Sequence, residues 1–215
     1  MNKSTFDLSL YLVTDSRNTS DEEFDRIVES AVQGGVTLVQ LREKTCSSRK
    51  FYEKALRLKR ILSCYQVPLI INDRLDIALA VDAEGLHIGQ SDLPYSVARK
   101  LLGPDKIIGL SVETLEDVKL ANSLDIDYIG VSPVFSTPTK TDTAAAVGLD
   151  GSAAINQLSV HPSVGIGGIN KENVASVIES GCAGVSLVSA IMSAVNPASA
   201  ASELKEIILK SKRIL

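Results

Sequence analysis

Cysteine, basic stretches and long apolar runs are all scarce in this chain of 215 residues. Its three cysteines are an odd number without CxxC spacing, which favours idle thiols in a reducing compartment over disulfides. No apolar run approaches about 18 residues, and the opening MNKSTFDLSL lacks a signal-peptide core, so we expect a soluble cytoplasmic protein with no membrane partner. A net charge of −4 without an evident basic face argues against nucleic acid as a partner.

The chain has instead eight short apolar runs, separated by segments with helical periodicity. Runs that are apolar on both faces are typical of a parallel sheet. Eight strand–helix units predict one α/β domain over residues 1–215, a (β/α)8 TIM barrel with its active site at the carboxyl ends of the strands. The expected strands are residues 8–15, 37–41, 68–72, 85–89, 106–112, 128–134, 164–167 and 184–188.

An open doubly wound sheet is the alternative fold. It would place a GxGxxG turn after the first strand, where Thr14, Asp15 and Ser16 stand instead. The expected helices begin after Ser20 and at residues 47, 75, 94, 114, 151, 171 and 198.

A glycine-rich segment, GIGGIN, ends the seventh expected strand. Gly167 and Gly168 would let a ligand approach the backbone, and Ser189 begins a helical stretch after the eighth strand. Because the loops after strands seven and eight form the usual phosphate site of this fold, we predict one here. The alternative is that the glycines only relieve crowding.

Arg42 and Lys44 follow the second expected strand two residues apart, on the same side as Gln40. A planar guanidinium beside a compact ammonium suits a pyrophosphate, although both could be solvated surface charges.

Asp73 ends the third expected strand and Asp92 lies just past the fourth, so the two carboxylates are predicted to be neighbours. A cation between them would relieve their repulsion, and one or two carboxylates completed by phosphate and water describe a Mg²⁺ site. In the alternative, Asp73 pairs with Arg74 or caps the next helix, and Asp92 caps the helix after that.

Several polar residues near strand ends allow more than one role. His87 is expected to be a hydrogen-bonded structural residue rather than a proton carrier, and Ser111 to hydrogen-bond a ligand. Thr137–Lys140 lies in a long loop whose hydroxyls and ammonium suit an anion, and such a loop is often a lid. Cys46 is not expected to be a nucleophile.

Eight motifs in order resemble the thiamine-phosphate synthase family from Leu10 to about Ile191: LYLVTD, QLREK, NDR, HIGQSDLP, GLSVET, PVFSTPTK, GIGGIN and GVSLVSAI. The resemblance implies a transferase that joins 4-amino-2-methyl-5-pyrimidinylmethyl diphosphate to 4-methyl-5-(2-phosphoethyl)thiazole, or to its carboxylated form. Thiamine phosphate and diphosphate would be the products, and Mg²⁺ the cofactor.

The resemblance also implies a role for each matching residue. Asp73 and Asp92 would bind Mg²⁺, and Arg42, Lys44, Ser111 and Lys140 would be catalytic. The pyrimidine diphosphate would contact Gln40, Leu41, Arg42, Glu43, Lys44, Asn72, Ser111 and Lys140, and the thiazole phosphate would contact Thr137, Pro138, Thr139, Gly168, Val188 and Ser189.

Two residues depart from the family pattern: Ser132 stands where glycine is frequent, and Glu113 where histidine is common. A related thiazole tautomerase is one alternative, but such relatives tend to carry a histidine where Pro133 stands. A non-catalytic paralogue that binds thiamine precursors is another, although it would be expected to lose Asp73, Asp92 or Lys140. The sequence is compatible with an oligomer of this protein.

Overall fold

Eight parallel strands close into a barrel in the computed structural model, which describes residues 6–16, 19–137 and 145–213. Each strand pairs with the next in the chain, and the first pairs with the last, so the predicted (β/α)8 TIM barrel is confirmed. The strands are β1 (Leu10–Val13), β2 (Leu38–Leu41), β3 (Leu69–Asn72), β4 (Gly85–Ile88), β5 (Ile107–Val112), β6 (Tyr128–Val131), β7 (Ser163–Ile166) and β8 (Gly184–Leu187).

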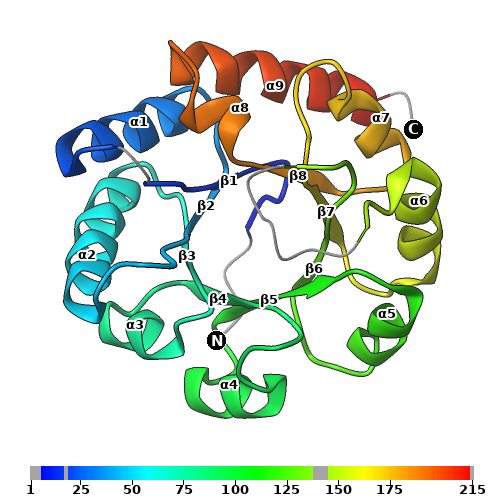
Figure 1. Ribbon diagram of the computed structural model, residues 1–215, viewed down its shortest axis with the longest axis horizontal. Coiled ribbons are helices and arrows are strands. Elements are labelled where there is room, and N and C mark those ends of the chain that lie inside the picture. The colour runs from blue at the N-terminus through cyan, green and yellow to red at the C-terminus, as the bar shows by residue number, and fades with distance from the viewer. Residues whose placement is uncertain (1–5, 17–18, 138–144, 214–215) are drawn as a thin grey trace.

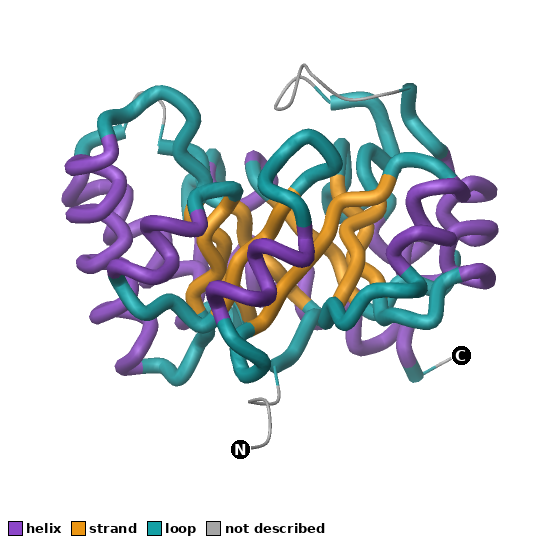
Figure 2. Tube along the Cα trace, turned by 90° about the horizontal axis from the view of Figure 1, so that it is seen from below, coloured by secondary structure: helices purple, strands orange, loops and turns teal. Residues whose placement is uncertain are grey.

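Helices form an outer ring around the strands, and the connecting loops gather at the two ends of the barrel (Figures 1 and 2). None of the helices in the described part of the chain is long and apolar enough to span a bilayer. The helices are α1 (Asp21–Gln33), α2 (Ser48–Cys64), α3 (Leu75–Ala80), α4 (Tyr95–Leu102), α5 (Leu115–Ala121), α6 (Gly148–Leu158), α7 (Val174–Glu179), α8 (Ser189–Met192) and α9 (Pro197–Lys212).

Local sequence signals explain where several helices begin. The Ser20 hydroxyl accepts a hydrogen bond from the Glu23 amide at 3.2 Å, and the Ser47 hydroxyl caps α2 in the same way. The α7 helix begins at Val174, three residues later than predicted. Asn170 and Asn173 accept hydrogen bonds from nearby backbone amides and hold the preceding residues in turns.

The strand β6 ends at Val131, three residues before the predicted end. Pro133 has no amide hydrogen, so it cannot continue the ladder. The Val134 amide nevertheless donates to the Ile166 carbonyl at 2.8 Å, which keeps the chain beside β7 as it leaves the barrel. The chain between β6 and α6 therefore starts over the mouth of the barrel.

Two groups of buried side chains stabilise the fold. The larger lies between the strands and the helices. The smaller fills the inside of the barrel and consists of Leu8, Tyr11, Leu38, Ile70, Ile107, Tyr128 and Val164. Because this inner group fills the part of the barrel nearest the amino-terminal ends of the strands, the room for a ligand lies at their carboxyl ends.

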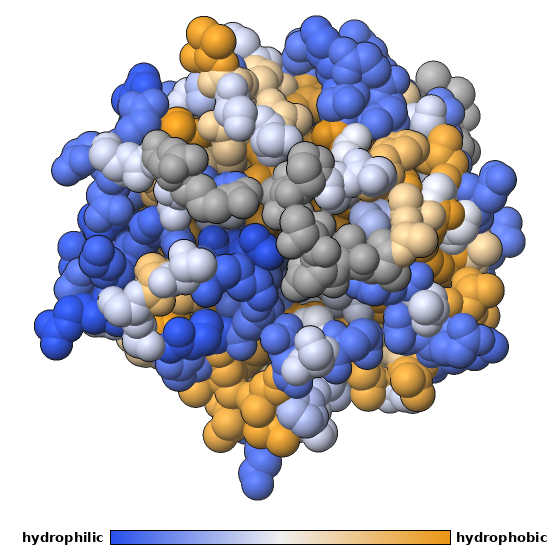
Figure 3. Space-filling model, viewed as in Figure 1, coloured by the Kyte–Doolittle hydropathy of each residue, from blue (hydrophilic) through white to orange (hydrophobic). Residues whose placement is uncertain are grey.

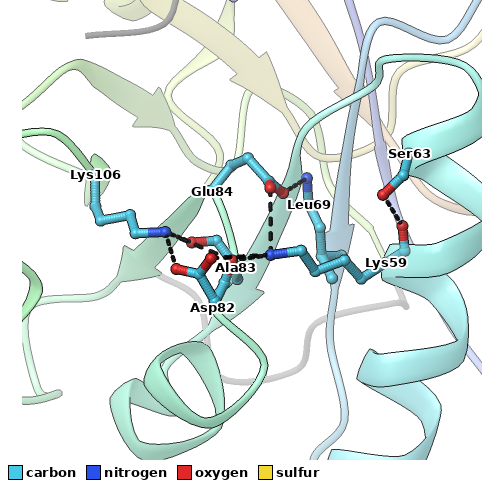
Figure 4. A network of polar contacts seen from close by, with 7 residues as sticks. All are labelled: Lys59, Ser63, Leu69, Asp82, Ala83, Glu84 and Lys106. Atoms are coloured by element: carbon cyan, nitrogen blue, oxygen red, sulfur yellow. Dashed lines mark hydrogen bonds and ion pairs between the residues drawn. The ribbon is translucent and has the colours of Figure 1, made fainter. Parts of the chain in front are cut away.

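A network of charged groups lies beside the amino-terminal ends of β3, β4 and β5 (Figure 4). The Glu84 carboxylate accepts a hydrogen bond from the Leu69 amide at 2.9 Å and lies 3.5 Å from the Lys59 ammonium. Lys106 pairs with Asp82 at 2.5 Å. The network fixes the starts of β3, β4 and β5, which suits a stabilising role at this end of the fold.

We expect Glu84→Ala to lower the free energy of unfolding by about 1–3 kcal/mol, because the Leu69 amide loses its acceptor. In a chain of this size each kcal/mol lowers Tm by roughly 2–4 °C. Glu84→Gln keeps an acceptor and should lose less. A thermal melt measures both variants, and a fall in kcat at a temperature where the variants are folded would contradict a purely structural role.

Candidate active site

A cavity of about 360 Å³ opens at the carboxyl ends of the strands, a volume within the ordinary range for small-molecule sites. Figure 3 looks onto this face, where hydrophilic side chains gather near the centre over β2, β3 and β4. The cavity brings together most of the residues predicted to bind substrate: Gln40, Arg42, Asn72, Ser111, Thr137, Gly168, Val188 and Ser189.

The glycine turn after β7 forms one wall of the cavity. Gly167 and Gly168 have φ angles of 101° and 63°, in the left-handed region that favours glycine. A Cβ atom at Gly168 would lie 2.7 Å from the Phe135 side chain and from the Ser136 carbonyl oxygen. The glycines therefore avoid crowding, as the alternative interpretation states, and they also expose backbone to the cavity. The phosphate site stays a prediction.

Arg42 and Lys44 take different positions although they lie two residues apart. Arg42 is half-buried and lines the cavity. Lys44 is exposed at the rim, where its ammonium lies 2.6 Å from the Asp73 carboxylate. Neither side chain is an isolated solvated charge, since one faces the cavity and the other belongs to an ion pair.

Asp73 and Asp92 are close neighbours, and neither plays the local role given in the alternative. Arg74 pairs with Asp76 at 2.6 Å rather than with Asp73. The helices α3 and α4 begin after Arg74 and Pro94, without any capping bond from a side chain. Asp73 itself has a φ of 60°, an uncommon conformation for a residue other than glycine.

The electrostatics of this pair suit a hard dication. Burial raises the pKa of Asp92 above its ordinary value, and the Asp73 carboxylate raises it further, whereas the Gly89 amide and Lys44 oppose the shift. Among the residues that the structure describes, one ammonium group, that of Lys44, thus faces two carboxylates. No set of three or more His, Cys, Asp and Glu side chains in the described ranges forms a metal cage. Two carboxylates alone fit Mg²⁺, which takes its remaining ligands from phosphate and water.

Some of the predicted residues do not line the cavity. Leu41 is fully buried in the outer core. The Glu43 carboxylate accepts hydrogen bonds from Ser16 at 2.6 Å and from Lys54 at 2.7 Å, so it holds α2 beside the loop after β1. Any substrate contact by these two residues would have to use their backbone. Pro138, Thr139 and Lys140 lie outside the described residues.

Cys46 has the environment of a structural thiol. Burial raises its pKa above the ordinary value, and the charge of Glu43 adds to the effect, so the thiolate form is disfavoured. This agrees with the expectation that Cys46 is not a nucleophile.

Sequence reasoning missed Ser186 in β8. Its side chain is 2% exposed and lines the cavity, and its hydroxyl has no hydrogen-bond partner among the described residues. Ser186 lies two residues before Val188, so the alternation of side chains along the strand could have placed both on the inner face. An unsatisfied hydroxyl there is suited to a ligand atom.

A family model described as thiamine monophosphate synthase matches residues 10–191. The chain belongs to this family. It is 52% identical over 201 residues to the thiamine-phosphate synthase of Syntrophomonas wolfei, covering 94% of this chain and 96% of that protein. It is 51% identical over 207 residues to the enzyme of Ruminiclostridium cellulolyticum, covering 96% and 98%.

A solved structure gives the same result. The thiamine phosphate pyrophosphorylase from Pyrococcus furiosus superposes with a TM-score of 0.86 at 36% identity, covering 95% of this chain and 96% of that one. The resemblance identified from the motifs is therefore confirmed. As a member of this family the chain is an enzyme, a transferase of a pyrimidinylmethyl group.

Proposed function

We propose that this transferase condenses 4-amino-2-methyl-5-pyrimidinylmethyl diphosphate with 4-methyl-5-(2-phosphoethyl)thiazole, or its carboxylated form, to give thiamine phosphate and diphosphate. One observation carries the proposal. A single cavity has the cationic Arg42 on one wall and the glycine turn at Gly168 on another, with the Asp73–Asp92 pair at neighbouring strand ends. Two phosphorylated substrates and one dication need such an arrangement.

The diphosphate belongs on the β2–β4 side of the cavity. The Arg42 guanidinium offers paired donors to phosphate oxygens, and Lys44 adds a positive charge at the rim. Asp73 and Asp92 would hold Mg²⁺, which when bound supplies charge neutralisation for the departing diphosphate. Asn72, at the end of β3, offers an amide for the pyrimidine. Lys140 remains a predicted contact.

The reaction makes one bond and breaks one. The bond between the methylene carbon and the diphosphate oxygen breaks, and its electron pair leaves with the diphosphate. The amino group of the pyrimidine spreads the positive charge left on the methylene carbon. The lone pair of the thiazole nitrogen then forms the new carbon–nitrogen bond, so no protein nucleophile is needed. The enzyme therefore contributes positioning and electrostatic stabilisation.

The thiazole phosphate belongs on the β7–β8 side. Gly168 exposes backbone there, and the Ser189 hydroxyl lies at the start of α8 on the same wall. Thr137 lines the cavity from the chain after β6. Val188 gives this side an apolar surface for the thiazole ring. With the two substrates on facing walls, the nitrogen and the methylene carbon meet in the middle of the cavity.

The direct test supplies both phosphorylated substrates with Mg²⁺ and follows diphosphate through a coupled pyrophosphatase assay. We expect release that requires both substrates and stops when the ion is chelated. Mass spectrometry should show thiamine phosphate in equal amount. Diphosphate released at the same rate without the thiazole would indicate a hydrolase and contradict the proposal.

A further inference from the structure

A chain of five hydrogen-bonded side chains crosses the floor of the cavity, each from a different strand. The Gln40 amide nitrogen donates to the Tyr11 hydroxyl at 2.7 Å. The hydroxyls of Tyr11 and Tyr128 are 2.8 Å apart. Tyr128 lies 2.9 Å from Nδ1 of His87, whose Nε2 lies 2.9 Å from the Ser111 hydroxyl. Both ends of the chain, Gln40 and Ser111, line the cavity.

The direction of every hydrogen bond follows from the Gln40 end. An amide nitrogen can only donate, so the Tyr11 oxygen accepts there. Tyr11 is buried, and its proton has no acceptor among the described residues other than the Tyr128 oxygen. Tyr128, equally buried, must then donate to His87 Nδ1. His87 is left neutral with its proton on Nε2, which it donates to Ser111.

The surroundings of the two tyrosines favour this order. Burial raises the pKa of both phenols, so both stay protonated and can act as hydrogen-bond donors. Room for the Tyr128 phenol comes from Gly109 on the adjacent strand, because a Cβ atom at that position would collide with the ring. The rings of Tyr11 and Tyr128 meet edge to face at 5.8 Å, which holds both hydroxyls in place.

We propose that Tyr128 and His87 are positioning residues that make Ser111 a hydrogen-bond donor to the substrate. Because His87 Nε2–H occupies a lone pair of the Ser111 oxygen, the hydroxyl proton of Ser111 points to an acceptor atom in the cavity. The chain of donors thus ends at the ligand. The identity of the substrate rests on the proposed function. The protonation state of His87 does not, because it follows from the hydrogen bonds of the folded protein.

The first experiment measures the tautomer of His87 without substrate. The protein has only two histidines, so ¹⁵N–¹H correlation spectra of a ¹⁵N-labelled sample can be assigned with a His161→Gln variant. We expect His87 to be neutral and protonated at Nε2 over the neutral pH range. A proton on Nδ1, or an imidazolium, would overturn the proposal even if the enzyme makes thiamine phosphate.

The second experiment compares two replacements of His87 that each keep one contact. Asparagine can reach the position of Nδ1 and face Tyr128, whereas the longer glutamine can place an amide N–H where Nε2 donates to Ser111. We expect His87→Asn to lower kcat by about 10- to 100-fold, since a displaced catalytic group costs up to about that much. His87→Gln should recover most of the loss. Equal losses in the two variants would contradict the proposal.

A double-mutant cycle with Ser111→Ala separates positioning from general damage. If His87 acts through Ser111, adding His87→Asn to Ser111→Ala should lower kcat by less than about threefold further, because the interaction is already lost. Fully additive losses would refute the proposal.

Tyr128→Phe keeps the ring and removes the donor to Nδ1, so it repeats the test at a second site if the His87 variants fold poorly. This variant should lower kcat more than it raises KM. An unchanged kcat would contradict the proposal that the row of hydrogen bonds positions Ser111.

Discussion

Asp73→Asn and Asp92→Asn are each expected to lower kcat by at least about 100-fold at ordinary Mg²⁺ concentrations, since a bound cation contributes several kcal/mol and each 1.4 kcal/mol is tenfold in rate. The amide keeps the shape of the side chain and removes the charge that a dication needs. Asparagine also tolerates the left-handed φ of 60° at position 73, so the backbone should not change there. Initial rates over a Mg²⁺ titration measure the effect.

The matched control is Asp76→Asn, which removes a nearby carboxylate that pairs with Arg74 outside the cavity. It should leave the Mg²⁺ dependence unchanged. An Asp73 or Asp92 variant that is fully active in the presence of chelator would show that the carboxylate pair does not hold the ion.

Asp92→Asn is also expected to stabilise the metal-free protein, although it lowers activity. The raised pKa of Asp92 means that its ionised form is unfavourable in the folded protein, mainly through burial and then through the repulsion of Asp73. Removing that charge should raise the Tm of the metal-free protein at neutral pH while activity falls. A thermal melt in chelator measures this, and a lowered Tm would argue for a structural rather than a metal-binding carboxylate.

Gly168→Ala is expected to raise the KM for the thiazole phosphate by at least about tenfold, with little change in the KM for the pyrimidine diphosphate. An alanine at a φ of 63° costs roughly 1–2 kcal/mol. Its Cβ atom would also lie 2.7 Å from the Ser136 oxygen and the Phe135 side chain, so the turn that lines the cavity has to shift. Steady-state kinetics with each substrate varied in turn measure the effect.

Gly148→Ala provides the control for backbone strain. Gly148 has a similar φ of 68°, but nothing lies within 4 Å of the position of its Cβ atom, and it does not line the cavity. This variant should lose a comparable amount of stability without a change in either KM. If Gly168→Ala raises both KM values equally, the turn does not belong to a separate phosphate site.

The arrangement of strands and helices could be predicted almost completely because each element carries its own local signal. The apolar runs, the caps at Ser20 and Ser47 and the glycines between elements act within a few residues. Eight parallel strand–helix units then have few ways to pack, and the closed barrel is the one observed. The neighbouring positions of Asp73 and Asp92 follow from the same rule, since adjacent parallel strands end side by side.

The direction of individual side chains depended on tertiary contacts. Glu43 stands in the same motif as Arg42 and Lys44, but its carboxylate bonds to Ser16 and Lys54, which are distant in sequence or on another element. Lys44 faces Asp73 only because β2 and β3 are adjacent. No periodicity in the sequence marks such partners.

The sequence by itself determined the order of the elements and the end of the barrel at which polar groups collect, because these follow from local periodicity and from parallel pairing. Only the tertiary structure decided which polar groups meet inside. The strands are buried on both faces, so their residue pattern does not mark the inner side, and closure of the barrel places Tyr11, Tyr128 and His87 in contact across up to 117 residues of chain.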